Sequence, residues 1–224
     1  MFEILKGGGW LMLPIIACSI IALAISVERL LALRIVKVAP PHLLAEVWGW
    51  IKNNQLDTNR LRELKQSSPL GLLFATGIAN AKYGRAVMKE SLEEAATVVV
   101  YGMERYLNAL GTVALVAPMF GLIGAVLGII DVFQNISLHG AGDANALAGG
   151  ISEALISTAA GLIVAVPATI MHRFFNGRVT TLILMLEQEA LKLVDALQGD
   201  RKVEIKAVGE KTAGEKAAGE KGVA

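Results

Sequence analysis

Three long stretches of this chain carry no charged residue. They cover residues 7–27, 107–130 and 154–171 and hold 21, 24 and 18 residues. A helix of about 20 apolar residues crosses the hydrocarbon layer of a bilayer. The sequence therefore predicts an all-α integral membrane protein with three transmembrane helices rather than a soluble domain.

The composition limits what else the chain can do. Hydrophobic residues make up 54% of its 224 residues, and a formal net charge of +1 gives no reason to expect nucleic acid as a partner. Cys18 is the single cysteine and lies inside the first apolar stretch, so we expect it to be a small apolar filler. We expect no metal site, no cofactor, no catalytic residue and no enzymatic activity.

The beginning of the chain could also be a cleaved signal peptide, because Ala22-Leu23-Ala24 resembles a cleavage site. However, the residues before the apolar stretch include Glu3 and Lys6 rather than a positive cluster, and the stretch is long. We therefore expect the first helix to be retained as an anchor.

Lys and Arg are distributed unevenly around the three stretches. Ten fall in residues 34–106 and nine in 172–224, whereas the connection 131–153 has none. Cytoplasmic segments collect Lys and Arg. The N-terminus and the short connection are therefore predicted to be periplasmic, and the middle segment and the C-terminus cytoplasmic.

These features predict seven consecutive segments. They are an N-terminal segment with the first transmembrane helix (1–33), a cytoplasmic helical segment (34–106), the second transmembrane helix (107–133), a periplasmic loop (134–149), the third transmembrane helix (150–172), a cytoplasmic helix (173–198) and a disordered tail (199–224).

The middle segment has the apolar spacing of helices, separated by breakers. Short helices are predicted over 42–52, 58–66 and 70–82. From Arg85 the apolar pattern continues without a breaker, so one long helix is expected to run into the second span. Residues 174–197 are expected to extend the third span in the same way, and the two extensions to form a cytoplasmic helical bundle.

The tail differs in composition from the rest of the chain. Gly-Glu-Lys recurs at 209–211, 214–216 and 219–221, without an aromatic residue. Such a segment buries too little apolar area to offset its chain entropy, which predicts disorder, with a helix formed on a partner as the alternative.

The second and third spans each have a side made of small residues. The simplest interpretation is close packing between helices, with Pro118 and Pro167 freeing backbone carbonyl groups that need a donor. The number of small residues favours a second interpretation, in which the stripes face a helix from another protein or a wetted path. The stripes comprise Ala114, Ala117, Gly121, Gly124, Ala125 and Gly128 in the second span, and Ala154, Ser157, Thr158, Gly161, Ala165, Ala168 and Thr169 in the third.

No ionisable side chain lies halfway across the predicted membrane. Asp131 and Glu153 both fall at the outer ends of their spans. A proton path made by this chain alone would contain hydroxyl groups but no titratable group at its centre. If protons cross here, a partner must supply the central carboxylate.

Two motifs connect the chain with known proteins. They are "GLIGAVLGIIDVF" at 121–133 and "GISEALISTAAGLIVAVPA" at 150–168. They resemble the paired signatures of the MotA/TolQ/ExbB proton-channel family, nearest its ExbB and ExbB-like members. The order and orientation of the spans and the long cytoplasmic segment also resemble that family, and only the tail falls outside the resemblance.

The resemblance implies a homopentamer in the bacterial inner membrane, in contact with lipid. The pentamer is expected to surround the helices of two ExbD-like single-span subunits, each bringing one essential Asp. Proton flow would turn the ring, and a TonB-like transducer would carry the motion to the outer membrane. The implied function is to energise TonB-dependent transport with the proton motive force.

The resemblance also assigns residues. Glu153 matches the family's acid at the outer end of the third span, which implies a role at the entrance of the proton path or in orienting the partner. Thr158 matches the Thr that faces the partner's Asp, and Ser157 is placed to assist. Separately from the resemblance, the small-residue stripes predict that Gly121, Gly124, Gly128 and Gly161 pack helices.

One position departs from the family pattern. The family has Gly-Thr-Val in the second span, where this chain has Gly124-Ala125-Val126. Ala125 cannot form a side-chain hydrogen bond, so one polar wall of the path is missing. Asp131 could compensate, or the chain conducts poorly or moves another ion.

Three alternatives remain open. The chain could be a TolQ-like subunit for envelope maintenance, or a scaffold that gathers partners without conducting. Gly140-Ala141-Gly142-Asp143 also fits the Gly-x-Gly-Asp string of intramembrane aspartyl proteases. That chemistry needs a second carboxylate beside Asp143, and no span offers one.

Overall fold

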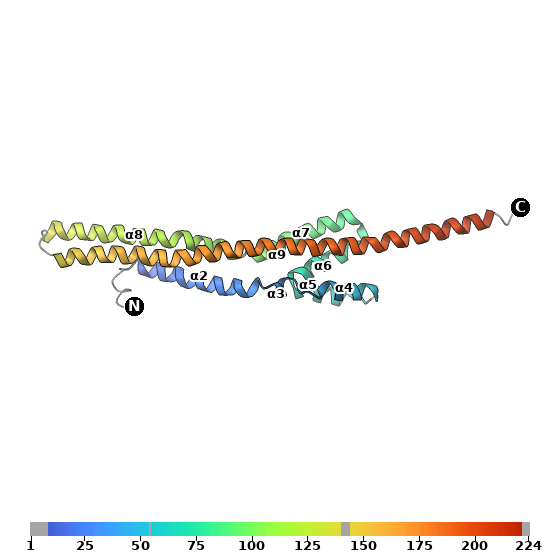
Figure 1. Ribbon diagram of the computed structural model, residues 1–224, viewed down its shortest axis with the longest axis horizontal. Helices are drawn as coiled ribbons and strands as arrows, with labels where there is room; N and C mark the ends of the chain where they lie inside the picture. Colours follow the sequence, from blue (N-terminus) through green and yellow to red (C-terminus); the bar gives the residue numbers. More distant parts are fainter. Residues whose placement is uncertain (1–8, 54, 140–143, 221–224) are drawn as a thin grey trace. The chain divides into compact units, whose positions relative to one another are not determined.

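The computed structural model describes the backbone of residues 9–53, 55–139 and 144–220, and their side chains except 139, 144–146 and 198–220. Every regular element in these ranges is helical (Figure 1). The elements are α2 (Met12–Ala32), α3 (Ile35–Val38), α4 (Leu43–Lys52), α5 (Thr58–Ser67), α6 (Pro69–Asn80), the 3-10 turn η1 (Ala81–Tyr83), α7 (Arg85–Glu104), α8 (Leu107–His139) and α9 (Ala144–Glu220).

Three helical stretches are long and apolar enough to cross a membrane. They are Met12–Ala32, Arg85–Leu138 and Leu147–Leu197. They contain the second and third charge-free stretches of the sequence in full, and residues 12–27 of the first. The predictions of an all-helical chain and of three membrane-capable helices are confirmed.

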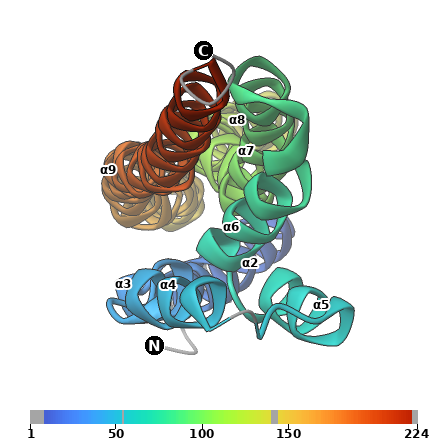
Figure 2. The ribbon, with the colours of Figure 1, turned by 90° about the vertical axis from the view of Figure 1, so that its right-hand side faces the viewer.

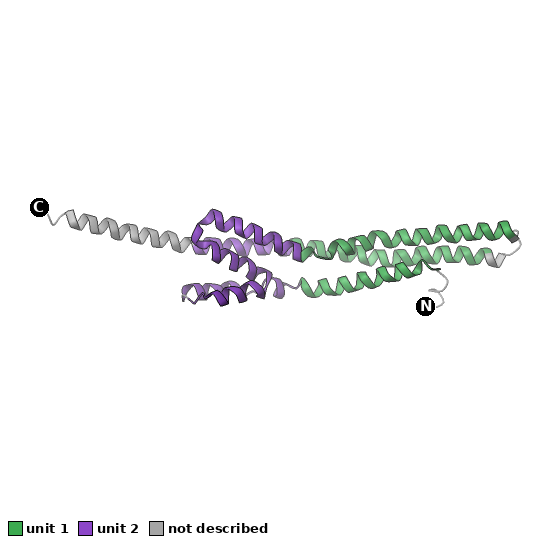
Figure 3. Cartoon of the chain, turned by 180° about the vertical axis from the view of Figure 1, so that it is seen from behind, with its two compact units in different colours: residues 1–33, 103–180 green, residues 34–102, 181–224 purple. Residues whose placement is uncertain are grey.

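The chain divides into two compact units, coloured separately in Figure 3. Unit 1 holds residues 1–33 and 103–180, and unit 2 holds 34–102 and 181–224. In unit 1, α2 packs against α8, and α8 runs antiparallel to the first part of α9. Figure 2 shows these helices nearly end-on.

The expected uninterrupted helix from Arg85 into the second span is wrong. α7 ends at Glu104, and Tyr106 has a left-handed backbone with a φ of 65° before α8 begins at Leu107. Such a backbone is costly for a residue with a side chain. No Pro or Gly marks the break in the sequence, and its cause lies in contacts from α2 described below.

The short helices of unit 2 begin where the sequence has capping residues. The Asp57 side chain accepts a hydrogen bond from the Thr58 backbone N–H, and Ser68 accepts one from the Gly71 N–H, at 3.0 Å. Pro69 takes the first position of α6, where its missing N–H costs nothing. The predictions of helices over 42–52, 58–66 and 70–82 are confirmed within a few residues.

Large apolar side chains fill the core of unit 2. Phe74 of α6 and Met88 of α7 are both 0% exposed. Gly77 of α6 lies against the side-chain ends of Met88, Leu92 and Leu193. α6, α7 and the second part of α9 therefore meet through side chains.

Two predicted boundaries differ from the structure. α8 continues to His139 and α9 begins at Ala144, so the connection predicted over 134–149 is shorter. The backbone of 199–220 continues α9 as a helix, whereas the sequence predicts a disordered tail. Ala, Glu and Lys are strong helix formers, so the tail has a local preference for helix. The prediction of disorder considered only how little apolar area the tail can bury.

Candidate functional site

α8 and α9 approach each other most closely at glycines. A Cβ added to Gly121 would lie 2.8 Å from the Ser157 carbonyl oxygen, and one added to Gly161 would lie 2.7 Å from the Ala117 carbonyl oxygen. Only glycine fits where backbones approach this closely. We call this contact the seam. It comprises Ala117, Gly121, Gly124 and Gly128 of α8, and Ala154, Ser157, Thr158 and Gly161 of α9.

Ser157 is turned into the seam. It is 0% exposed, and a Cβ added to Gly124 would lie 2.9 Å from its hydroxyl oxygen. One turn earlier on α9, Ala154 meets Gly128 in the same way, with 3.2 Å between the Ala154 Cβ and an added Cβ. Ser157 therefore faces α8 of its own chain.

This geometry changes the interpretation of the two stripes. We favoured stripes that face a helix from another protein, but the structure places much of each stripe against the other. Helical periodicity predicted which small residues share one side of each helix. On that side α8 and α9 pack against each other, as in the simpler interpretation. The sides of the two helices that form this contact are not open to a helix from another protein.

Thr158 lies at the edge of the seam. It is half-buried, and its hydroxyl donates a hydrogen bond to the Ala154 carbonyl oxygen at 3.1 Å, with the Gly121 carbonyl oxygen at 3.4 Å. A hydroxyl has one proton and two lone pairs. With its proton directed to its own helix, the Thr158 oxygen can accept a hydrogen bond from a group outside the seam.

The other predicted path residues are spread along the same helices. Glu153 is half-buried and its carboxylate touches Gly9, directly before α2. Ala125 is half-buried and Asp131 is exposed. The structure thus brings Ser157 and Thr158 together, but it does not bring Asp131 to them. Asp143 lies outside the described residues.

Both prolines lie inside continuous helices. Pro118 is half-buried within α8, and Pro167 is exposed within α9. Each lacks the N–H that would bond to a carbonyl group four residues earlier, so Ala114 and Ile163 lose their helical donor. Neither proline ends its helix.

Sequence reasoning missed a buried arginine. Arg29 of α2 is 5% exposed, pairs with Glu28, and donates a hydrogen bond to the Met103 carbonyl oxygen at 3.0 Å. Its guanidinium also lies 5.6 Å from the centre of the Tyr106 ring. These contacts stabilise the break between α7 and α8. The signal in the sequence was the charged pair Glu28-Arg29 inside an otherwise apolar helix.

A histidine lies farther along the α8–α9 contact. The His172 ring packs on Gly111, where an added Cβ would lie 2.9 Å from the ring, and its Nε2 is 3.1 Å from the Asn176 amide nitrogen. Its Nδ1 is buried and has no hydrogen-bond partner in the part of the chain that the structure describes. Gly111 here accommodates a ring rather than another backbone.

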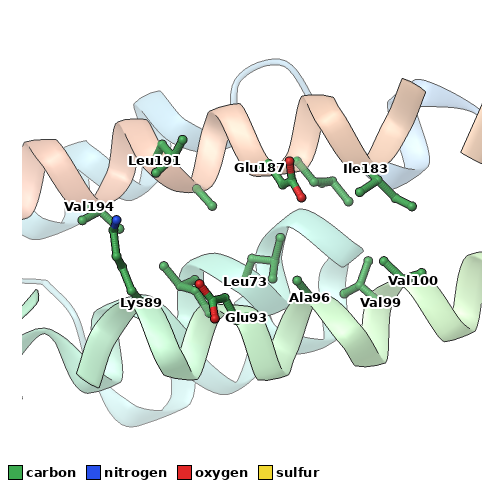
Figure 4. Close-up of a pocket in the computed structure, with 13 residues that line it drawn as sticks. Leu73, Lys89, Glu93, Ala96, Val99, Val100, Ile183, Glu187, Leu191 and Val194 are labelled. Atoms are coloured by element: carbon green, nitrogen blue, oxygen red, sulfur yellow. The ribbon is translucent and has the colours of Figure 1, made fainter. Parts of the chain in front are cut away.

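Unit 2 contains an open groove of about 240 Å³. Figure 4 shows side chains of α9, among them Ile183 and Leu191, facing side chains of α7 such as Val99, with Leu73 of α6 between them. The lining is mostly apolar, with Lys89, Glu93 and Glu187 as its charged members. Within the described ranges, no three His, Cys, Asp or Glu residues are grouped to hold a metal ion.

Comparison with known proteins shows which family the chain belongs to. The profile of the MotA/TolQ/ExbB proton channel family matches residues 65–188, more than half of the chain and both motifs. The chain belongs to the MotA/TolQ/ExbB proton channel family. With its three membrane-capable helices, it is a multi-pass membrane protein of a transport family.

Several relatives are named for ExbB. ExbB-like 3 of Synechocystis sp. is 28% identical over 174 residues, which are 76% of this chain and 82% of that protein. The ExbB homolog of Methanothermobacter thermautotrophicus is 31% identical over 180 residues, 79% of this chain and 63% of that protein. Biopolymer transport protein ExbB of Neisseria gonorrhoeae is 36% identical over 118 residues, 53% of this chain and 47% of that protein. The match thus spans about half of the Neisseria relative.

Proposed function

We propose that this chain is the proton-channel subunit of an inner-membrane motor that energises TonB-dependent transport across the outer membrane. The observation that carries the proposal is the family match over residues 65–188, which contains both motifs and most of two membrane-capable helices. The subunit is not an enzyme. It acts as a homopentamer around an ExbD-like single-span partner, and its motion is passed to a TonB-like transducer.

The charge distribution explains why a partner is needed. Residues 107–130 and 154–171 contain no charged side chain, so the chain has no titratable group at mid-depth. Proton transfer across that region needs a group that binds and releases the proton. A transmembrane Asp on the partner would be that group.

Thr158 is the residue placed to meet this acid. Its hydroxyl proton is directed to the Ala154 carbonyl oxygen, and its lone pairs remain to accept a hydrogen bond. A protonated carboxyl group can donate that bond, whereas an ionised one cannot. Contact with Thr158 would therefore favour the protonated acid, which is the form that carries the proton across.

The orientation follows from the basic residues. With Lys and Arg concentrated in 34–106 and 172–224, these segments are cytoplasmic and the N-terminus is periplasmic. Unit 2 would then be a cytoplasmic helical bundle, and Glu153 would lie at the periplasmic entrance of the path.

The first test compares two changes at Thr158. The chain is reconstituted into liposomes with an ExbD-like partner, and lumen acidification is measured under an imposed proton gradient. Thr158→Val keeps the shape but loses the hydroxyl. It should lower the rate about two- to tenfold, since a hydrogen bond between neutral groups is worth roughly 0.5–1.5 kcal/mol.

Thr158→Ser is the matched control, because it keeps the hydroxyl and should retain most of the flux. Liposomes that contain the chain without the ExbD-like partner measure the background leak of protons. Equal flux in wild type and Thr158→Val would show that the hydroxyl has no part in conduction.

A non-conducting scaffold is the second candidate. It is favoured by Ala125, which has no hydroxyl, and by the complete burial of Ser157 in the seam. A scaffold would co-purify with the ExbD-like partner and give no flux above the leak. The TolQ-like alternative has less support, because the relatives described above are named for ExbB.

A further inference from the structure

The residues directly before α2 cover one side of Glu153. Gly9 has a left-handed backbone with a φ of 67°, and a Cβ added there would fall on the Glu153 carboxylate. Glycine is thus required at this position for two independent reasons, the backbone conformation and the close approach of the carboxylate. No side chain separates the main chain at residue 9 from Glu153.

Leu11 attaches the same segment to α8. It is 5% exposed, and its Cδ1 lies 3.8 Å from the position of a Cβ on Gly124. Trp10, between the two contacts, is 71% exposed. We call residues 9–11 the strap.

The strap crosses one turn of the seam. Glu153 and Ser157 are successive turns of α9, and Gly124 lies opposite Ser157. The strap contacts Glu153 at one end and reaches Gly124 at the other. Ile15 continues the attachment on the first turn of α2 with 2% exposure, so the strap is anchored on its C-terminal side.

Glu153 is not held by a cation of the described residues. In the part of the chain that the structure describes, it has no ion-pair partner, and its side chain is half-buried. A carboxylate without a cation is positioned by the atoms that surround it. The main chain at Gly9 is one such neighbour.

We infer that the strap shields and positions Glu153, and that it must move aside before protons or cations from solvent reach that side of the carboxylate. Gly9 is then a positioning residue that acts through Glu153. The inference rests on the proposed function only in connecting Glu153 with proton entry, because the shielding itself is a property of this chain.

The test measures the reactivity of Glu153. The full chain in detergent micelles is treated with a water-soluble carbodiimide and glycine ethyl ester, and labelling of each carboxyl group is followed by mass spectrometry. Gly9→Ala should raise the labelling rate of Glu153 at least twofold, with an upper limit of about thirtyfold, the largest factor by which a left-handed backbone disfavours alanine. Labelling of the exposed Asp131 in the same molecules should not change.

Gly149→Ala is the matched control. It also adds a methyl group to a glycine, one turn before Glu153, but the added Cβ would have nothing within 4 Å. Its Glu153 labelling should equal that of wild type. Leu11→Ala provides a second approach if Gly9→Ala does not fold, since it loosens the other end of the strap and should also raise Glu153 labelling.

Three results would overturn the inference. They are unchanged Glu153 labelling in both strap variants, an equal rise in Gly149→Ala, or a parallel rise at Asp131, which would indicate general loosening. The proposed function is tested separately by flux. Faster labelling with no flux in any variant would support the strap and contradict the channel, whereas unchanged labelling with flux that depends on Thr158 would do the reverse.

Discussion

The two compact units pack their helices in different ways. In unit 1, glycines bring α8 and α9 together, so that a Cβ added to Gly161 would lie 2.7 Å from a backbone oxygen. In unit 2, a Cβ added to Gly77 would meet only side-chain ends, the nearest being the Met88 Cε at 3.2 Å. At these two positions glycine serves backbone contact and side-chain contact respectively. Both kinds occur in each unit, since Gly71 of unit 2 lies against the Leu64 carbonyl oxygen and Gly111 of unit 1 against the His172 ring.

The difference matches the surroundings that each unit is predicted to have. Lipid tails are as apolar as Leu, so helices in a membrane gain little by burying large side chains and associate through close contact and hydrogen bonds. Phe74 and Leu193, both 0% exposed, form a core of large side chains in unit 2, and Leu110 and Phe175 are buried in the same way in unit 1, outside the seam. Unit 2 should therefore be sensitive to losing side-chain volume, and the seam of unit 1 to gaining it.

The largest effect is expected in unit 2. Phe74→Ala removes a fully buried ring and should lower the free energy of unfolding by about 3–5 kcal/mol. The measurement is denaturant unfolding in micelles, with hydrogen exchange to show that α6 loses protection. Leu115→Ala on α8 is the control, since Leu115 is 61% exposed and its truncation should cost less than about 1 kcal/mol. Equal losses would mean that burial of the side chain does not decide the cost of truncating it.

The next effect is expected in the seam. Gly121→Ala adds a methyl group 2.8 Å from the Ser157 carbonyl oxygen, so the two backbones must separate. Overpacking costs about 1–3 kcal/mol. The measurement is again unfolding in micelles, followed by exchange of the α8 amides.

Gly149→Ala is the control for this change. Alanine in an open helical position gains about 0.5–1 kcal/mol over glycine, so this variant should be slightly more stable than wild type. A seam that tolerates Gly121→Ala as well as this control would not be packed through its backbones.

The elements that follow local rules could be predicted from the sequence. The spans follow from stretches without charge, and α5 and α6 from the breakers and capping residues at Asp57, Ser68 and Pro69. The break at Tyr106 could not be predicted, because it depends on Arg29, which lies 74 residues from Met103 in the chain. A contact of that range has no local signal.

Only part of the candidate site could be predicted, because some of its contacts also join residues that are distant in the sequence. Periodicity placed Ser157 and Gly124 on the small-residue sides of their helices, and the structure confirms that grouping. Periodicity does not tell whether such a side meets lipid, a partner or the next helix of the chain. The contact of Glu153 with Gly9 joins residues far apart in sequence, and the only local signal was the run of glycines before Trp10.

The smallest effect should come from Gly77→Ala in unit 2. The added Cβ would lie 3.2–3.4 Å from the ends of Met88, Leu193 and Leu92, which are flexible and can shift by a few tenths of an ångström. The helical preference of alanine, worth about 1 kcal/mol, opposes this strain. The free energy of unfolding should therefore change by less than about 1 kcal/mol, measured beside Gly121→Ala. A loss as large as that of Gly121→Ala would show that α6 lies as close to its neighbours as α8 does to α9, and the contrast between the units would disappear.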